Sequence, residues 1–97
     1  MSDVIAGAVE ALNRKLDRGF DGTAKFIIEG EGTILLDGKG ARPADDGEEA
    51  RVTLRASREV FEALLAGQLD PTSAFMSGKL GIEGDMGQAM KLGGVLA

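Results

Sequence analysis

The chain has 97 residues, of which 43% are hydrophobic and 28% are charged, as in a soluble globular protein, and this length fits one domain over residues 1–97. It contains no Cys and no His, which excludes a disulfide framework, a zinc thiolate site, a Ser-His-Asp triad and a Cys-His pair. Acidic residues outnumber basic ones by 16 to 11, and the net charge of −5 disfavours binding to nucleic acid and to anionic membranes.

The first predicted element is an amphipathic helix that Ser2 or Asp3 can cap and that Gly19 ends. Its apolar residues recur at spacings of three and four and form one stripe: Val4, Ile5, Ala8, Val9, Leu12 and Leu16. The segment begins with an acidic residue and does not resemble a signal peptide. No apolar run in the chain reaches the roughly 20 residues that span a bilayer, so we expect a cytoplasmic protein.

Two short strands are predicted next, over residues 24–30 and 33–37, with Gly-Glu-Gly between them as a hairpin turn. Residues that alternate along a strand point to opposite faces. Ile27 and Leu35 are apolar although they face away from the other apolar residues of the hairpin. The sequence therefore predicts either cover on both faces of the hairpin or an exposed apolar strip.

Residues 38–42 predict a weak third strand, and residues 43–50 predict a loop with turn residues and four carboxylates. The simpler interpretation of this acidic loop is a solvated connection between strands. The sharper one is a metal-binding loop, although Asp45-Asp46-Gly47 lacks the alternating ligand spacing of an EF-hand.

Residues 51–56 alternate between apolar and polar side chains, which predicts a strand with one solvated face. Ser57 is a suitable N-cap for the helix that follows, and Gly67 ends it. The apolar residues of this helix form one stripe: Val60, Phe61, Leu64 and Leu65.

The last third of the chain alternates helix, strand and helix. Asp70-Pro71 opens a short helix, residues 79–84 predict a strand, and Asp85 caps a last helix that Gly93-Gly94 end or fray. The order of elements predicts an α+β fold, with early strands that pair antiparallel and helices that cover mainly one face of a single sheet.

The glycine-rich segments lack the spacing of phosphate-binding loops. Neither Gly30-Glu31-Gly32 nor Gly38-Lys39-Gly40 has a third glycine three residues later, and Leu80 follows Gly78-Lys79 where a P-loop needs Ser or Thr. Turns and helix ends account for these glycines. Because the usual catalytic residue types are also missing, we predict that the chain is not an enzyme.

Three methionines and a phenylalanine lie close together in the C-terminal segment: Phe75, Met76, Met86 and Met90. Methionine is flexible and polarizable, so it lines surfaces that adapt to varied apolar shapes, but it also fills ordinary cores. Six glycines in the same segment leave little side-chain volume, which is consistent with a cavity beneath a movable lid.

Residues 70–92, with the sequence DPTSAFMSGKLGIEGDMGQAMKL, resemble the sterol carrier protein 2 family in its G-K-L-x-I-x-G strand and the M-x-x-A-M-K-L segment that follows. The resemblance extends back through the F-x-x-L-x-x-G pattern at Phe61, Leu64 and Gly67 and is looser before residue 50. Ser77 stands where the family often has a longer polar residue. The early C-terminus without a peroxisomal signal suggests a bacterial stand-alone member.

This resemblance implies a five-stranded, mainly antiparallel sheet with helices covering one face, which encloses an apolar tunnel. The tunnel of the family holds fatty acids, acyl-CoAs or sterols. The resemblance implies no metal and no other cofactor. By position, seven residues are candidates for the lipid-binding wall: Phe61, Leu65, Phe75, Met76, Ile82, Met86 and Met90.

We therefore predict a module that binds a lipid and transfers it, with transient contact to a membrane or a partner enzyme. The alternative is a structural or protein-interaction module with a collapsed core and no ligand. A third hypothesis is an accessory domain that presents a lipid to a separate enzyme.

Overall fold

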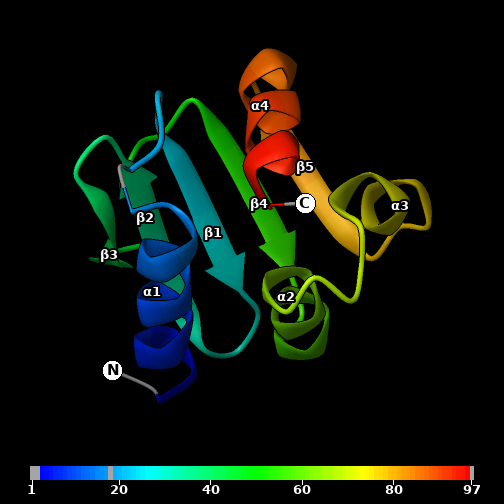
Figure 1. Cartoon of the computed structure of the whole chain (residues 1–97), viewed down its shortest axis with the longest axis horizontal. Helices are drawn as coiled ribbons and strands as arrows, with labels where there is room; N and C mark the ends of the chain where they lie inside the picture. Colours follow the sequence, from blue (N-terminus) through cyan, green and yellow to red (C-terminus); the bar gives the residue numbers. More distant parts are fainter. Residues whose placement is uncertain (1–2, 18, 97) are drawn as a thin grey trace.

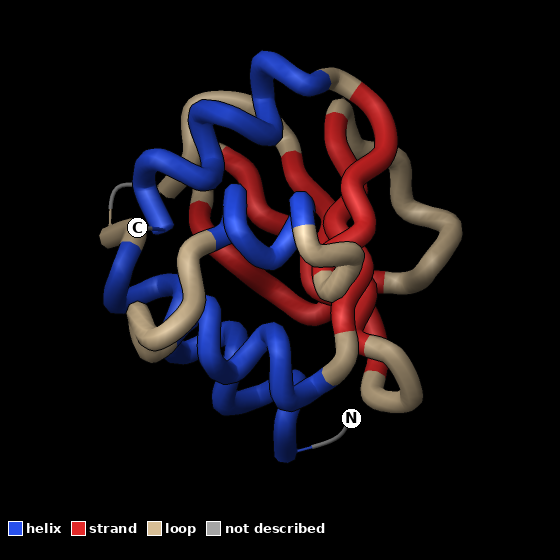
Figure 2. Tube along the Cα trace, turned by 90° about the vertical axis from the view of Figure 1, so that its right-hand side faces the viewer, coloured by secondary structure: helices blue, strands red, loops and turns tan. Residues whose placement is uncertain are grey.

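The computed structural model describes residues 3–17 and 19–96, which form an α+β fold with four helices and a five-stranded mixed sheet (Figure 1). The helices gather on one side of the strands (Figure 2). The elements are, in chain order, α1 (Asp3–Lys15), β1 (Ala24–Ile28), β2 (Gly32–Asp37), β3 (Gly40–Ala44), β4 (Val52–Ala56), α2 (Arg58–Leu65), α3 (Pro71–Met76), β5 (Leu80–Gly84) and α4 (Met86–Leu96). The predicted order and type of the elements are confirmed.

The strands lie in the order β3-β2-β1-β4-β5. As predicted, β1, β2 and β3 form an antiparallel meander. The last strand, β5, pairs antiparallel with β4. The sheet is mixed because β4 returns beside β1 and runs parallel to it. The segment of residues 57–96 therefore lies at the β4–β5 end of the sheet, and α1 packs at the β2–β3 end.

The core lies between the sheet and the helices. Phe26 and Phe61 meet in its centre, with ring centroids 5.2 Å apart and planes at 72°, the edge-to-face geometry that aromatic rings favour. The largest side chains that are almost completely buried come from α1, the three strands β1, β2 and β4, and α4. They are Phe26, Leu12, Ile28, Ile34, Leu36, Leu92 and Val52.

The apolar residue Leu35 on the far face of the hairpin is covered without a second layer of helices. Its neighbours in register are Lys25 and Arg42, whose aliphatic stems can flank it. The Nζ atom of Lys25 donates hydrogen bonds to the carbonyl oxygens of Asp46 and Glu48, at 2.8 and 3.0 Å. The acidic loop is thereby tied to this face, and Leu35 is buried.

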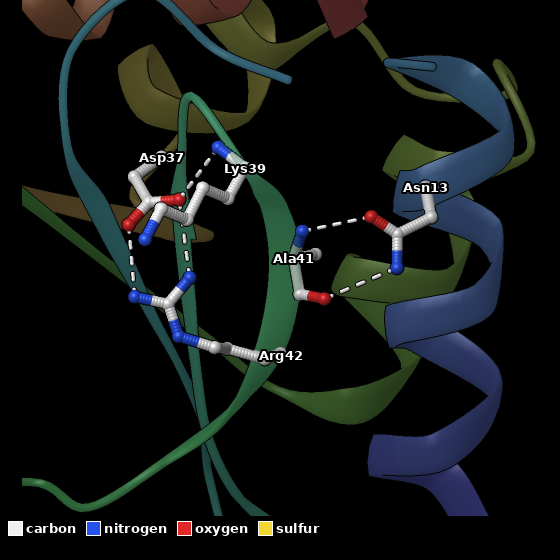
Figure 3. A network of polar contacts seen from close by, with 5 residues as sticks. All are labelled: Asn13, Asp37, Lys39, Ala41 and Arg42. Atoms are coloured by element: carbon white, nitrogen blue, oxygen red, sulfur yellow. Dashed lines mark hydrogen bonds and ion pairs between the residues drawn. The ribbon is translucent and has the colours of Figure 1, made fainter. Parts of the chain in front are cut away.

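The edge strand β3 is held on both sides by side chains (Figure 3). Asn13 of α1 pairs with the backbone of Ala41: its Nδ2 atom donates to the carbonyl at 3.1 Å, and its Oδ1 atom accepts from the N–H at 2.8 Å. Arg42 makes two hydrogen bonds to the carboxylate of Asp37, at 3.1 and 2.8 Å. These bonds, with one from the Lys39 N–H, lower the pKa of Asp37 to about 2.

Two predicted boundaries are wrong. Pro43, predicted to begin the acidic loop, lies in β3, where an edge strand tolerates a residue without an N–H. Gly93-Gly94, predicted to end or fray the last helix, lies inside α4, which continues to Leu96. The burial of Leu96 in the core favours this extra turn despite the low helix propensity of glycine.

Candidate functional site

A cavity of about 400 Å³ lies at the β4–β5 end of the sheet, bounded by α2, α3, β5 and α4. This volume is within the range of small-molecule sites in proteins. Phe26 and Leu54, which are partners in register on the neighbouring strands β1 and β4, contribute to its wall from the sheet. The cavity is therefore built from both the early and the late parts of the chain.

Six of the seven residues predicted for a lipid-binding wall line this cavity, and they come from four elements: Phe61, Leu65, Phe75, Ile82, Met86 and Met90. The structure thus brings together side chains that are up to 29 positions apart. Their contact with a lipid remains a prediction. The structure shows a cavity with a partly exposed rim and not the enclosed tunnel that the resemblance implies.

Met76 was predicted to line the same wall, and this placement is wrong: its side chain is 80% exposed and does not line the cavity. The short helix α3 turns Pro71 and Ala74 inward. Met76 follows Ala74 by two residues, which is about 200° around a helix of 3.6 residues per turn, so its side chain points away from the core.

Several wall residues were not predicted. Besides Phe26 and Leu54, they include Leu64, Pro71, Leu80 and Leu96. The alternation of the strands does place Phe26, Leu54 and Leu80 on the inward face. However, the sequence cannot distinguish an inward residue beneath a cavity from one beneath a packed helix.

The rim of the cavity is apolar and exposed. Among the described residues, the large hydrophobic side chains that are more than a third exposed all come from α3 and α4: Phe75, Met76, Met86, Met90 and Val95. Grouped exposed apolar side chains mark contact sites for ligands, membranes or proteins. The same two helices therefore form the wall of the cavity and an apolar surface beside it.

The wall offers little charge. Asp70 is the charged residue among the described lining residues, and its carboxylate already accepts a hydrogen bond from the N–H of Ser73 at 3.0 Å, as the N-cap of α3. Within residues 3–17 and 19–96, no three Asp or Glu side chains come together to hold a metal ion. The geometry is suited to apolar ligands, whose affinity comes from burial of hydrocarbon.

The helix α4 is attached to the rest of the fold by few polar contacts. As predicted, Asp85 caps it, since the carboxylate accepts a hydrogen bond from the Gly87 N–H at 2.8 Å. Further along, the Nζ atom of Lys91 lies 3.2 Å from the Asp21 carboxylate in an exposed ion pair. Such pairs are weak. The burial of Leu92 and Leu96 therefore dominates the attachment of α4.

Comparison with known proteins identifies relatives over nearly the whole chain. The family model described as the SCP-2 sterol transfer family matches residues 6–97. Hydroxysteroid dehydrogenase-like protein 2 of Danio rerio is 45% identical over 82 residues, which are 78% of this chain and 20% of the relative. Human sterol carrier protein 2 is 42% identical over 65 residues, which are 64% of this chain and 12% of that protein.

A solved structure has the same fold. Sterol carrier protein 2 from Aedes aegypti, in complex with the C16 fatty acid palmitate, gives a TM-score of 0.78 at 20% identity, and the match covers 100% of this chain and 97% of that one. The chain spans about a fifth of the length of the first curated relatives it matches, which are vertebrate proteins. Within the described residues, no helix is long and apolar enough to cross a membrane.

Proposed function

Because the chain belongs to the SCP-2 sterol transfer family, we propose that it binds a lipid in the cavity between α2, α3, β5 and α4 and carries or presents it. The observation that supports this function best is the convergence of six predicted wall residues on one apolar cavity. The fold shared with a palmitate complex supports the same class of ligand.

We propose a ligand with a long hydrocarbon part, such as a fatty acid, an acyl-CoA or a sterol-like molecule. Each CH₂ group moved from water into the cavity contributes about 0.8 kcal/mol, so an alkyl chain can bind without a charged anchor. A polar head group would remain near the exposed rim formed by Phe75, Met86 and Met90, because the described wall supplies no cation to hold it inside.

Release of the lipid would require α4 to move away from the cavity. Its few polar attachments favour such a movement, and its exposed apolar side chains would contact the acceptor, either a membrane or a partner enzyme. The relatives named hydroxysteroid dehydrogenase-like protein 2, such as those of Xenopus laevis and Danio rerio, are about five times longer than the match, which favours presentation to an enzyme as one form of this function. We further propose that this takes place in the cytoplasm.

The vertebrate origin and greater length of the curated relatives give no support to the expectation of a bacterial stand-alone member. The alternative of a protein-interaction module also remains. The observation in its favour is the exposed apolar rim on α3 and α4, which is suited to a protein partner as well as to a lipid.

The lipid-binding function can be tested with a variant whose new side chain fills the cavity. A Cβ atom at Gly93 would lie 3.9 Å from the Cβ of Pro71, which is ordinary contact, so Gly93→Leu directs a side chain between α4 and α3 without a backbone clash. Val95→Leu is the control, because Val95 is an exposed residue of the same helix that does not line the cavity. Binding is measured by titration of a fluorescent fatty acid and by native mass spectrometry.

We expect Gly93→Leu to lower the affinity at least tenfold and Val95→Leu to keep it within twofold. If the unmodified protein binds neither a fatty acid nor a sterol at micromolar concentration, the proposed function is wrong. If Gly93→Leu folds and binds as well as the unmodified protein, the ligand binds elsewhere, and the exposed rim becomes the candidate site.

A further inference from the structure

A second cavity of about 450 Å³ lies on the other side of α2, between this helix and α1. It is a groove open to solvent, since its lining residues Gly7, Arg58 and Glu62 are exposed. Its inner surface is formed by small and apolar residues of both helices, which include Val4, Gly7, Ala8 and Ala11 on α1. The small side chains of α1 are the reason for the space, because they leave a gap where larger residues would pack against α2. This cavity is separate from the candidate site described above.

The two cavities share part of their walls. Phe61 and Leu65 line both of them, and they lie four residues apart on α2, so their side chains are neighbours on one face of that helix. Phe61 is buried and packs edge-to-face on Phe26. Leu65 is only partly buried at the margin of the core, so of the two it is the side chain that can change rotamer at low cost.

The charges around the second cavity indicate which part of a lipid it suits. Asp3, Arg58 and Glu62 lie at its border, and the guanidinium of Arg58 already pairs with the carboxylate of Glu62, with Nε and Oε1 3.0 Å apart. Two carboxylates and one paired guanidinium disfavour an anionic head group. The apolar inner surface instead suits the methyl end of a hydrocarbon chain.

We propose that the second cavity receives the distal end of acyl chains that are too long for the first, and that Leu65 controls the passage between the two. The chain length that this protein accepts is then set by Leu65 together with the small residues Gly7 and Ala11 of α1. This inference rests on the proposed lipid-binding function and extends it to the length of acyl chain that the protein accepts.

The test fills the second cavity and leaves the first unchanged. A Cβ atom at Gly7 would meet no other atom within 4 Å, so Gly7→Leu places a side chain in the gap without a backbone clash. Ala6→Leu is the matched control, because Ala6 is an exposed neighbour on α1 that does not line the cavity. The dissociation constants of decanoate and stearate are measured for each protein by displacement of a fluorescent fatty acid, and circular dichroism verifies the fold.

We expect Gly7→Leu to lower the affinity for stearate at least tenfold and the affinity for decanoate less than twofold. The reason is that each CH₂ group kept in water costs about fourfold in affinity. Ala6→Leu should leave the affinity for both acids unchanged. Leu65→Ala, which widens the passage, should raise the affinity for stearate relative to that for decanoate. This variant provides the test if Gly7→Leu does not fold. An equal effect on both acids, or none in either folded variant, overturns the inference and leaves lipid binding intact. Absence of binding to any acid in the unmodified protein overturns both.

Discussion

The two ends of the sheet are covered in opposite ways. At one end, α1, β2 and β3, here called the closed half, place large apolar side chains in the core, where Leu12, Ile34 and Leu36 are almost completely buried, although α1 also borders the second cavity. At the other end, α3, β5 and α4, here called the open half, enclose a cavity and expose methionines such as Met86 and Met90. Both halves belong to one sheet and one continuous core.

The difference follows from the residue types that each half uses. The buried positions of β2 and α1 in the closed half include Leu and Ile, whose branched side chains pack in well-defined rotamers and specify one structure. The open half has the methionines and six glycines, which adapt in shape and leave space unfilled. We infer that the closed half contributes most of the stability and that the open half contributes the binding surface.

The largest expected effect comes from a pair of truncations, one in each half. Leu36→Ala removes a completely buried side chain and should lower the free energy of unfolding by about 3 kcal/mol, because it leaves a cavity in a packed core. Met90→Ala removes a side chain that is 76% exposed and should change stability by less than about 0.5 kcal/mol. Urea denaturation followed by circular dichroism measures both.

When the affinity for a fatty acid is measured, the order of the two effects should reverse, with the larger effect in Met90→Ala. Met90 lines the cavity, so Met90→Ala should weaken binding severalfold, whereas folded Leu36→Ala should bind normally, since Leu36 lines neither cavity. If Met90→Ala destabilises the protein as much as Leu36→Ala does, the methionines of the open half are ordinary core residues and the distinction between the halves is lost.

A second pair of substitutions tests how closely the backbone is packed in each half. Gly19 and Gly78 both have left-handed backbone angles, with φ of 75° and 79°, so alanine costs about 1 kcal/mol at either position. A Cβ atom at Gly19 would also lie 2.5 Å from the carbonyl oxygen of Gly38, in the turn between β2 and β3, whereas one at Gly78 meets nothing within 4 Å. Gly19→Ala should therefore be more destabilising than Gly78→Ala, by about 2 kcal/mol, because the added methyl group forces the backbone around Gly38 to shift. If thermal denaturation shows equal losses of stability for the two variants, the backbone of the closed half accommodates an added methyl group as easily as that of the open half.

Much of the fold could be predicted because local signals and burial agree. Ser57, Asp70 and Asp85 cap helices where the sequence indicates them, and the alternation of the strands gives the correct inward faces. The exceptions depend on distant contacts. The burial of Leu96 extends α4 through two glycines, and this burial depends on the packing of α4 against residues far away in the sequence.

The candidate site was less predictable than the fold. The family pattern and the inward faces of the elements are enough to predict that residues such as Ile82 and Met86, which lie in the matched segment, line the cavity. They do not give the rotation of a short helix, and Met76 was assigned to the wrong side of α3 for this reason. Nor do they indicate that α1 and α2 leave a second space, because that depends on how closely two helices approach.

The smallest expected effect concerns pH and the ion pair at the edge of the closed half. The hydrogen bonds from Arg42 and the Lys39 N–H lower the pKa of Asp37 from 3.8 to about 2 in the folded protein. A carboxyl whose pKa is lower in the folded than in the unfolded state stabilises the fold above pH 4, and this contribution is lost as the pH falls from about 4 to 2. Asp37→Asn should lower stability at pH 7 by about 1 kcal/mol or less, since the pair lies at the surface.

The difference between Asp37→Asn and the unmodified protein should therefore shrink toward zero when denaturation is repeated from pH 7 down to pH 2. Asp21→Asn is the matched control, because Asp21 lies between α1 and β1, its carboxylate is 98% exposed, and it makes an exposed ion pair with Lys91 of α4 in the open half. We expect no measurable change in the free energy of unfolding for this control at pH 7, since an exposed ion pair contributes little. If Asp21→Asn lowers the free energy of unfolding more than Asp37→Asn does, the ion pair with Lys91 holds α4 in place. This result would contradict the proposed role of α4 as the movable wall of the cavity.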